Sequence, residues 1–179
     1  MRESIPGAGA AEGVVIRSAR PRDARSFLEM LKSVAAERRF IRTEDVRRSP
    51  RSHRRRFRRS WTDRRADIVA VADGRVVGHL TISREDRPVI RHVATLGMAV
   101  AADWRGRGVG SALLAEALRW AEEFGVEKVE LSVFPHNEPA IALYRKFGFK
   151  EEGRLERHSR KSYGYEDEIL MGLWMGPEG

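Results

Sequence analysis

A glycine-rich loop joins an apolar segment, residues 96–100, to a segment of helical periodicity that begins at Val109. The loop reads Arg105-Gly106-Arg107-Gly108-Val109-Gly110, an Arg-x-x-Gly-x-Gly pattern. Glycine adopts turns that residues with a Cβ resist, and it leaves the backbone N–H groups unobstructed. Such N–H groups at the start of a helix form an anion site suited to a pyrophosphate. We therefore expect a strand–loop–helix unit that holds a phosphate-bearing cofactor.

Two common phosphate-binding loops do not fit this pattern. A P-loop ends in Gly-Lys-Ser/Thr, whereas Gly110 is followed by Ser111 and Ala112. A dinucleotide-binding fingerprint places Gly-x-Gly-x-x-Gly/Ala directly after a strand. Here Leu113 or Ser111 stands where the third Gly or Ala is needed, and a polar spacer separates the strand from the glycines.

Three motifs together resemble the GCN5-related N-acetyltransferase (GNAT) superfamily. The pattern Arg105-x-x-Gly108-x-Gly110 after an apolar strand resembles its acyl-CoA loop. The block Asn137-x-x-Ala140-Ile141-x-Leu143-Tyr144-x-x-x-Gly148-Phe149 is similar to its late helix. The opening Ile16-Arg17-x-Ala19-x-x-x-Asp23-Ala24 resembles its first strand and helix start. The resemblance covers residues 14–174, and the order and spacing of the motifs make it specific.

The periodicity of the chain predicts an α/β domain. Strands are expected at residues 14–18, 68–72, 76–83, 93–100, 128–134, from 149 onwards and at 163–174. Helices are expected at 23–36 with Asp23 as N-cap, at 51–61, at 109–125, and at 137–148 with Asn137 as N-cap. Asp73-Gly74 predicts a tight hairpin between two of the strands. The expected fold is a single GNAT-like mixed sheet of about seven strands flanked by about four helices.

The length of 179 residues fits one domain, and we expect a flexible N-terminus at residues 1–13 and an N-acetyltransferase domain at 14–179. No apolar run approaches the ~20 residues that a membrane helix needs. The chain has no cysteine, which excludes disulfides and thiolate chemistry and favours a cytoplasmic protein.

The resemblance implies that acetyl-CoA binds along the strand and the loop. Met98, Ala99 and Val100 would run beside the pantetheine arm, and one of their N–H groups would polarise the thioester carbonyl. Core packing is the alternative role for Met98 and Val100. The full set of expected cofactor contacts is Met98, Ala99, Val100, Arg105, Gly106, Arg107, Gly108, Val109, Gly110, Ser111, Asn137, Ala140 and Tyr144. No metal site is expected.

Tyr144 is the expected general acid. It lies two helical turns after Asn137, so the two side chains share a helix face. A phenol has a pKa of ~10 and an alkyl thiol one of ~8.5, close enough for a well-placed tyrosine to protonate a departing thiolate. A core tyrosine on an amphipathic helix is the alternative, and the motif favours the acid.

The general base is left open by the sequence. Some peptide-directed members of the superfamily carry a Glu where this chain has Ser132, and a hydroxyl cannot take a proton from an ammonium group. An acceptor that arrives in its neutral form would need no base. Other candidates are Glu130, His92, His136, Glu85 and Asp167.

Residues 42–65 carry eleven arginines and three acidic residues, which accounts for the whole net charge of +8. One interpretation is a solvated helix face over the acceptor cleft. The other is a site for an anionic partner, because arginine binds carboxylates bidentately. Nucleic acid is not expected, since the only aromatic residues of the segment, Phe57 and Trp61, share one apolar helix face with His53.

These features predict an acetyl-CoA-dependent N-acetyltransferase (EC 2.3.1.-) that transfers acetyl directly to a primary amine and releases coenzyme A. The block Asp167-Glu168-x-Leu170-Met171 resembles a bacterial branch that acts on small amines or free amino acids, so we expect that kind of acceptor. The alternatives are a protein N-terminal or lysine acetyltransferase, a non-catalytic acyl-CoA sensor, and an RNA-binding accessory protein. The sequence leaves open whether the chain is a monomer or a homodimer.

Overall fold

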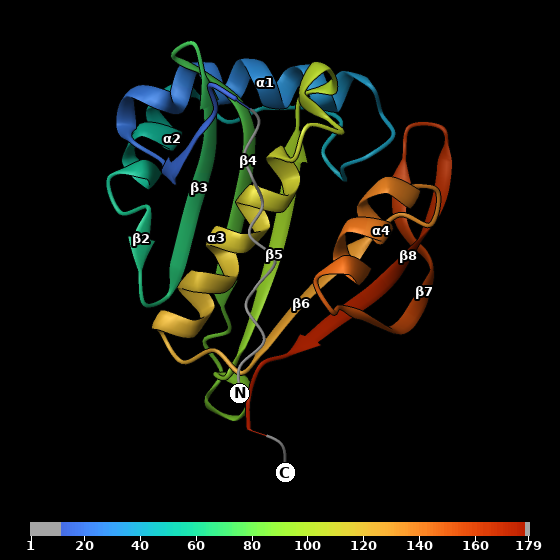
Figure 1. Cartoon of the computed structure of the whole chain (residues 1–179). Coiled ribbons are helices and arrows are strands. Elements are labelled where there is room, and N and C mark those ends of the chain that lie inside the picture. Colours follow the sequence, from blue (N-terminus) through green and yellow to red (C-terminus); the bar gives the residue numbers. More distant parts are fainter. Residues whose placement is uncertain (1–11, 178–179) are drawn as a thin grey trace.

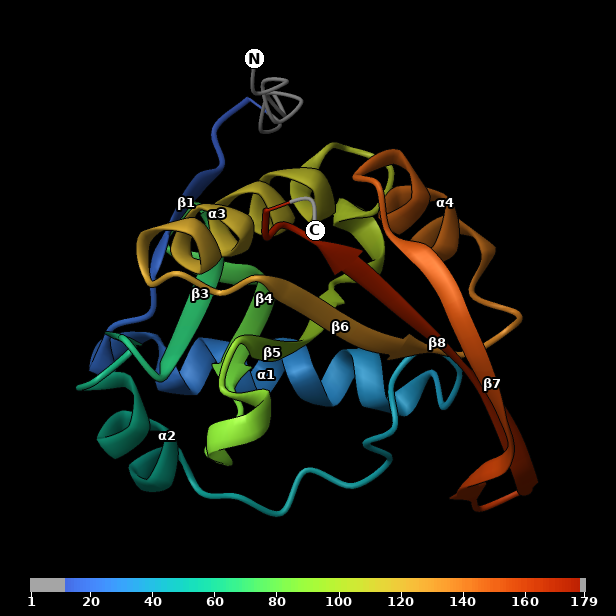
Figure 2. The same ribbon diagram turned by 90° about the horizontal axis from the view of Figure 1, so that it is seen from below.

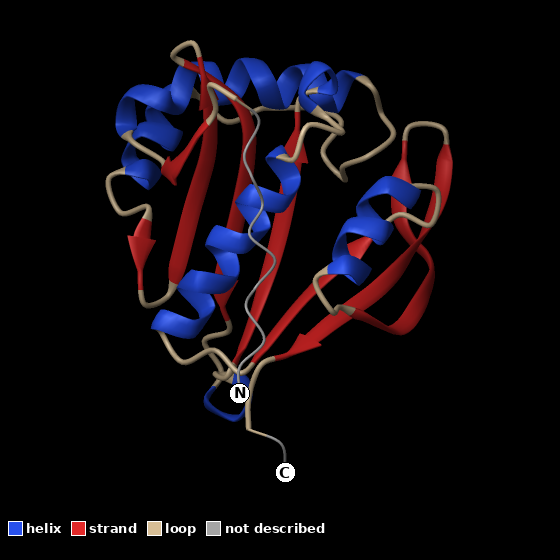
Figure 3. Cartoon of the chain, in the orientation of Figure 1, coloured by secondary structure: helices blue, strands red, loops and turns tan. Residues whose placement is uncertain are grey.

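The computed structural model describes residues 12–177, which form one mixed sheet with helices on both faces (Figures 1 and 3). The strands are β1 (Val15–Ser18), β2 (Trp61–Thr62), β3 (Arg65–Ala72), β4 (Arg75–Arg84), β5 (Val93–Val100), β6 (Lys128–Val133), β7 (Lys150–Lys161) and β8 (Gly164–Trp174). Their order is β1-β3-β4-β5-β6-β8-β7, with the short β2 beside β3. The predicted α/β class and mixed sheet are confirmed, with eight strands in place of about seven.

Four α-helices cover the sheet. They are α1 (Ala24–Ala36), α2 (Pro50–Phe57), α3 (Val109–Glu123) and α4 (Glu138–Lys146). Figure 2 shows α1 and α2 on one face of the sheet and α3 and α4 on the other. Short 3-10 turns lie at Pro21–Asp23, Pro88–Ile90 and Ala102–Trp104.

Strand alternation divides the interior into two cores. Ile68 and Ala70 of β3 pack into the larger core together with residues of α3 and α4. The intervening Val69 packs into the smaller core with Phe27 of α1 and Phe57 of α2. Successive side chains of a strand point to opposite faces, so a central strand that is apolar throughout supplies both cores.

The predicted hairpin at Asp73-Gly74 is confirmed. Ala72 of β3 pairs with Arg75 of β4, which leaves a two-residue loop. Asp73 has φ +48° and Gly74 has φ +74°. Two positive φ values define the type I′ turn that fits the twist of a hairpin.

Within residues 12–177 one pair of strands, β5 and β6, is parallel, and it separates along its length. β5 and β6 pair only at Val93, Ala94 and Thr95 of β5. Beyond this point β5 continues to pair with β4 as far as Val100, while β6 pairs with β8. Figure 1 shows β5 and β6 together at one end and far apart at the other. The edge of β5 from residue 96 to residue 100 therefore has no partner strand in the described part of the chain.

The second helix is shorter than the predicted 51–61. Ser49 accepts a hydrogen bond from the Ser52 N–H at 3.4 Å and Pro50 takes the first helical position, so α2 begins there. It ends at Phe57. The prediction that Trp61 shares its helical face was wrong, because Trp61 lies in β2 and pairs with β3.

Two predicted N-caps occupy the cap position without making a side-chain cap bond. The Asp23 carboxylate instead accepts the Arg20 N–H of the preceding 3-10 turn and binds the Arg17 guanidinium. The Asn137 backbone carbonyl accepts the N–H groups of Ala140 and Ile141, both at 3.1 Å. The start of α4 is therefore capped by the Asn137 backbone and not by its side chain.

Residues 1–11 lie outside the described part of the chain, so the predicted flexibility of residues 1–13 stays a prediction. Glu12 and Gly13 form a turn before β1. No helix within residues 12–177 is long and apolar enough to cross a membrane.

Candidate active site

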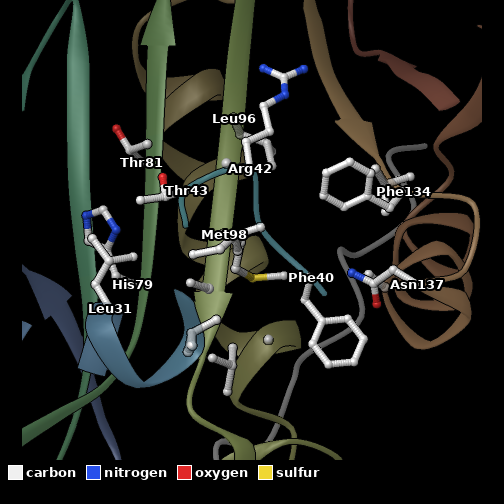
Figure 4. A pocket seen from close by; sticks show the side chains of 18 of the residues that line it. Leu31, Phe40, Arg42, Thr43, His79, Thr81, Leu96, Met98, Phe134 and Asn137 are labelled. Carbon is white, nitrogen blue, oxygen red and sulfur yellow. The ribbon is translucent and has the colours of Figure 1, made fainter. Parts of the chain in front are cut away.

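A cavity of about 1200 Å³ opens where β5 and β6 separate. We call its two parts the α4 arm and the α2 arm. The α4 arm, between β5 and α4, is lined by residues that include Met98, Val100, Gly108, Asn137 and Tyr144. The α2 arm, between the sheet and the α1–α2 pair, is lined by residues that include Leu31, Arg48, His53, His79 and Thr81. Figure 4 shows His79 and Thr81 on one side of β5, and Phe134 and Asn137 across the gap on the other.

The free edge of β5 presents backbone groups to the α4 arm. The Ala101 N–H donates to the Val77 carbonyl of β4 at 2.9 Å. Because the direction of backbone groups alternates along a strand, those of Val100 and Met98 point away from β4 and into the gap. The side chains of Met98 and Val100 pack against the larger core. Met98 and Val100 therefore combine side chains that pack in the core with backbone groups that face the gap. The backbone groups of Ala99 point toward β4 instead.

The loop after β5 leaves the start of α3 without a side-chain cap. Gly106 has φ +71° and Gly108, the N-cap of α3, has φ +78°. The first intrahelical bond runs from the Ala112 N–H to the Gly108 carbonyl at 3.0 Å. The N–H groups of the first turn, at residues 109–111, have no intrahelical partner. They form a row of donors that an anion can accept.

Three loop residues use their side chains elsewhere. Val109 is buried in the larger core. The Arg107 guanidinium lies 5.3 Å from the centre of the Trp104 ring. The two Arg105 terminal nitrogens bind the Glu37 carboxylate at 2.7 and 2.6 Å. Neither Arg107 nor Val109 lines the cavity, and the buried Val109 could meet a cofactor only through its backbone.

Gly110 allows α3 and α4 to approach each other closely. A Cβ at this position would lie 3.1 Å from Leu143 Cδ2 and 3.6 Å from Met98 Cε. Ser111 and Ala140 line the same arm of the cavity. The loop, β5 and α4 thus converge on one space.

Tyr144 projects from α4 into the cavity wall. It is 5% exposed, and its hydroxyl has no hydrogen-bond partner within residues 12–177. Its ring packs against Phe149, with centroids 5.7 Å apart. Burial raises the pKa of Tyr144 above the ordinary value, so the phenol stays protonated at neutral pH.

The five base candidates named from the sequence lie away from this space. None of Glu130, His92, His136, Glu85 and Asp167 lines the cavity. His136 Nε2 lies 2.7 Å from the Arg39 carbonyl, and Asp167 pairs with Arg154 at 2.8 Å. His136 therefore contacts the segment that follows α1, and Asp167 of β8 contacts β7.

Two buried carboxylates at or next to the cavity were not foreseen as part of the site. The first is Glu168 of β8, which is 1% exposed and lines the cavity. Burial alone would raise its pKa, but hydrogen bonds from Arg42, Ser159 and Ser132 outweigh burial and hold the pKa at about 2. Arg42 Nε donates to it at 2.7 Å. Glu168 is therefore an ionised anchor for the segment that precedes α2.

The second buried carboxylate is Asp67 of β3, which is 0% exposed. Its partners are Arg56 of α2 at 2.9 Å, Arg65 at 3.1 Å and His79 Nε2 of β4 at 3.1 Å. Burial opposes its ionisation, but His79 and Arg56 outweigh burial and depress the pKa of Asp67. The sequence held one signal for this pair. Asp67 directly precedes the apolar strand predicted at 68–72, and His79 lies inside the strand predicted at 76–83.

Most of the arginine-rich segment is solvated, and a few of its members serve the cavity. The arginines that line the cavity are Arg42, Arg47, Arg48, Arg56 and Arg105. Four of them pair with carboxylates, namely Glu168, Asp45, Asp67 and Glu37. Arg48 makes no ion pair or side-chain hydrogen bond within residues 12–177, so it is the free arginine of this wall.

The Glu168 network predicts a pH-dependent part of stability. A carboxylate with a depressed folded pKa stabilises the fold above its unfolded value of 4.5, and this stabilisation is lost as the pH falls toward about 2. Glu168→Gln should lower the free energy of unfolding by about 1–2 kcal/mol at pH 7, since half-exposed Arg42 can hydrate. Urea unfolding at pH 7 and pH 3 measures both effects.

The wild type should lose more stability than Glu168→Gln between these pH values. Glu156→Gln, at an exposed position of β7, is the matched control and should follow the wild type. Equal losses for wild type and Glu168→Gln would contradict the assignment.

Comparison with known proteins places this arrangement among acetyltransferases. Residues 31–149 match the Acetyltransferase (GNAT) family. The L-amino acid N-acetyltransferase AaaT of Escherichia coli is 41% identical over 118 residues, which are 62% of this chain and 73% of AaaT. A GNAT-family acetyltransferase from Streptococcus pneumoniae superposes with a TM-score of 0.84 at 28% identity, covering 91% of this chain and 99% of that one. A ribosomal-protein-alanine N-acetyltransferase from Brucella melitensis superposes with a TM-score of 0.81 at 27% identity, covering 89% and 99%.

Proposed function

The chain belongs to the GNAT family of acetyltransferases, and from this membership we propose that it transfers acetyl from acetyl-CoA to the amino group of a small, carboxylate-bearing acceptor such as an amino acid. The observation that carries the proposal is the free edge of β5 that leads to the uncapped start of α3. The edge can pair with the amide groups of a pantetheine arm. The helix start can accept the pyrophosphate.

The residues present fit this co-substrate. The backbone groups of Met98, the N–H of Val100 and the amide of Asn137 face the same gap and would hold the pantetheine. The Val100 carbonyl already accepts a hydrogen bond from Arg105 Nε at 3.0 Å. The N–H groups of residues 109–111 would hold the pyrophosphate. When bound, the thioester supplies an activated acetyl group, and an N–H of the β5 edge would stabilise negative charge on its oxygen.

Tyr144 is proposed as the general acid for the departing thiolate. Its unpaired hydroxyl, its place in the cavity wall and its protonated state support this role. The burial that raises the phenol pKa would also raise that of a thiolate in the same space, so the two stay comparable. The chain has no cysteine, and we propose direct attack of the amine without an acetyl-enzyme.

A small acceptor with a carboxylate fits the α2 arm. The segment between α1 and α2 is joined to β8 by Arg42 and Glu168 and to β7 by Lys161, whose ammonium donates to the Ile41 carbonyl at 2.5 Å. Arg48 is the cavity arginine free to bind a carboxylate. AaaT, at 41% identity, is an L-amino acid N-acetyltransferase, which supports the same kind of acceptor.

Arg48→Gln should raise the KM for an amino acid about 10- to 100-fold with little change in kcat. A charge-assisted hydrogen bond contributes about 1.5–3 kcal/mol, and each 1.4 kcal/mol is a factor of ten. The KM for the corresponding amine without a carboxylate should not change. Arg54→Gln, an exposed arginine of α2 outside the cavity, is the control. Equal effects of Arg48→Gln on both acceptors would rule out carboxylate recognition.

Thiol release from acetyl-CoA with matched acceptors tests the proposed function. The panel contains amino acids, the amines that lack the carboxylate, and short peptides with a free N-terminus. Turnover with the amino acids supports the proposal. Turnover with peptides alone would assign a protein acceptor, and acetyl-CoA binding without thiol release would indicate a non-catalytic sensor.

A further inference from the structure

We propose that His79, held by Asp67, is the general base that takes the proton from the acceptor ammonium group in the α2 arm. This inference rests on the proposed function and names the base that the sequence left open.

The floor of the α2 arm is built from β4 and β5. The strand register places His79 opposite Ala99 and Thr81 opposite Gly97, so these four residues share one face of the sheet. A Cβ at Gly97 would meet no atom within 4 Å. The floor therefore has open space beside His79, next to the strand that is proposed to hold the thioester.

Asp67 fixes the tautomer of His79. His79 Nε2 lies 3.1 Å from Asp67 Oδ1, and the ionised carboxylate can only accept a hydrogen bond. Nε2 must then carry the proton, which leaves the lone pair on Nδ1. Nδ1 has no hydrogen-bond partner within residues 12–177, and the His79 side chain lines the cavity, where Figure 4 shows it.

The surroundings keep this imidazole neutral. Burial lowers the pKa of His79, and Asp67 opposes that effect only in part. The charged and titratable groups that face it are His53 and Arg56 from α2 and Asp67 and Arg65 from β3. A neutral imidazole is the form that a base requires before it meets an ammonium group.

Glu168 is the rival base in the same cavity and is poorly suited. Hydrogen bonds from Arg42, Ser159 and Ser132 occupy its oxygens and hold its pKa at about 2. Such a carboxylate has little affinity for an ammonium proton. His79 has one partner on one nitrogen and a free lone pair on the other.

Nδ1 of His79 takes one proton from the acceptor ammonium and later returns it to solvent. The neutral amine forms a C–N bond to the acetyl carbon, and the C–S bond breaks. The thiolate takes a proton from Tyr144, which regains one from the second N–H lost by the amine. The products are the amide, the free thiol of coenzyme A and one proton.

His79→Gln is the decisive variant, because its amide can still donate to Asp67 but cannot accept a proton at neutral pH. We expect kcat/KM for an amino acid at pH 7 to fall about 100-fold or more. The acidic limb of the wild-type profile, set by a group that titrates below pH 6.5, should disappear. With an acceptor amine that is already neutral at the assay pH, the kcat/KM of His79→Gln should fall only slightly. The Kd for acetyl-CoA, measured by calorimetry, should stay within about twofold of the wild type.

His53→Gln is the matched control, since His53 is also buried and also packs on Phe27 but has no carboxylate partner. It should retain the acidic limb. A His79→Gln variant that keeps this limb, or loses the same factor at every pH and with every amine, would overturn the proposal.

A wild-type measurement gives an independent test if the variant fails to fold. With His79 as base, acceptors of different amine pKa should share one acidic limb. If the limb instead follows the pKa of each acceptor, no protein base acts and the inference is wrong. Absence of any turnover by the wild type would reject the proposed function itself.

Discussion

Tyr144→Phe should lower kcat about 100- to 10,000-fold while the Kd for acetyl-CoA changes by less than about twofold. The phenol is the unpaired proton donor in the wall of the α4 arm, and removing its oxygen leaves the thiolate without an acid. The phenylalanine ring keeps the packing against Phe149. Steady-state kinetics and calorimetry on the same preparation separate turnover from binding.

Tyr165→Phe is the matched control, because Tyr165 is exposed on β8 and does not line the cavity. It should behave as the wild type. Unchanged kcat in Tyr144→Phe would remove this residue from the mechanism, and an equal loss of acetyl-CoA affinity would make it a packing residue.

Gly108→Val should lower the affinity for acetyl-CoA about 100-fold or more while the protein remains folded. Gly108 has φ +78°, where a β-branched residue is strained by about 1–2 kcal/mol. The added methyl groups would also stand at the start of α3, beside the N–H groups proposed to bind the pyrophosphate. Loss of one or two charge-assisted hydrogen bonds accounts for the expected factor.

Gly74→Val provides the control for strain alone. Gly74 has φ +74° in the β3–β4 hairpin, and a Cβ there would meet no atom within 4 Å. Its loss of stability should resemble that of Gly108→Val without any loss of acetyl-CoA affinity. Normal binding by Gly108→Val would show that the pyrophosphate lies elsewhere.

Local sequence patterns were sufficient to predict the elements that form the α4 arm. The strand at 93–100, the glycine-rich loop and the start of α3 are consecutive, so period, turn residues and helix signals describe them together. The same holds for Asn137 and Tyr144 on one short helix. The sequence did not reveal how the backbone groups of β5 are directed. Those of Met98 and Val100 point into the gap, whereas those of Ala99 point toward β4.

The residues that meet in the α2 arm could not be predicted from local sequence patterns. Arg48, Asp67 and His79 come from separate elements and meet only through the strand register and the packing of α2. Periodicity suggested the apolar face of α2 but not that Arg56 turns inward to a buried carboxylate. Trp61 was misplaced because that helix ends at Phe57, four residues before it.

A crystal structure of the protein with acetyl-CoA would show whether the gap between β5 and β6 is the cofactor site. We expect the pantetheine between β5 and β6, bonded to the backbone of Met98 or Val100, with the pyrophosphate at the N–H groups of residues 109–111. We also expect the sulfur near Tyr144 and the acetyl group toward the floor beside His79. A cofactor bound outside the gap between β5 and β6, or with its sulfur far from Tyr144, would contradict this assignment.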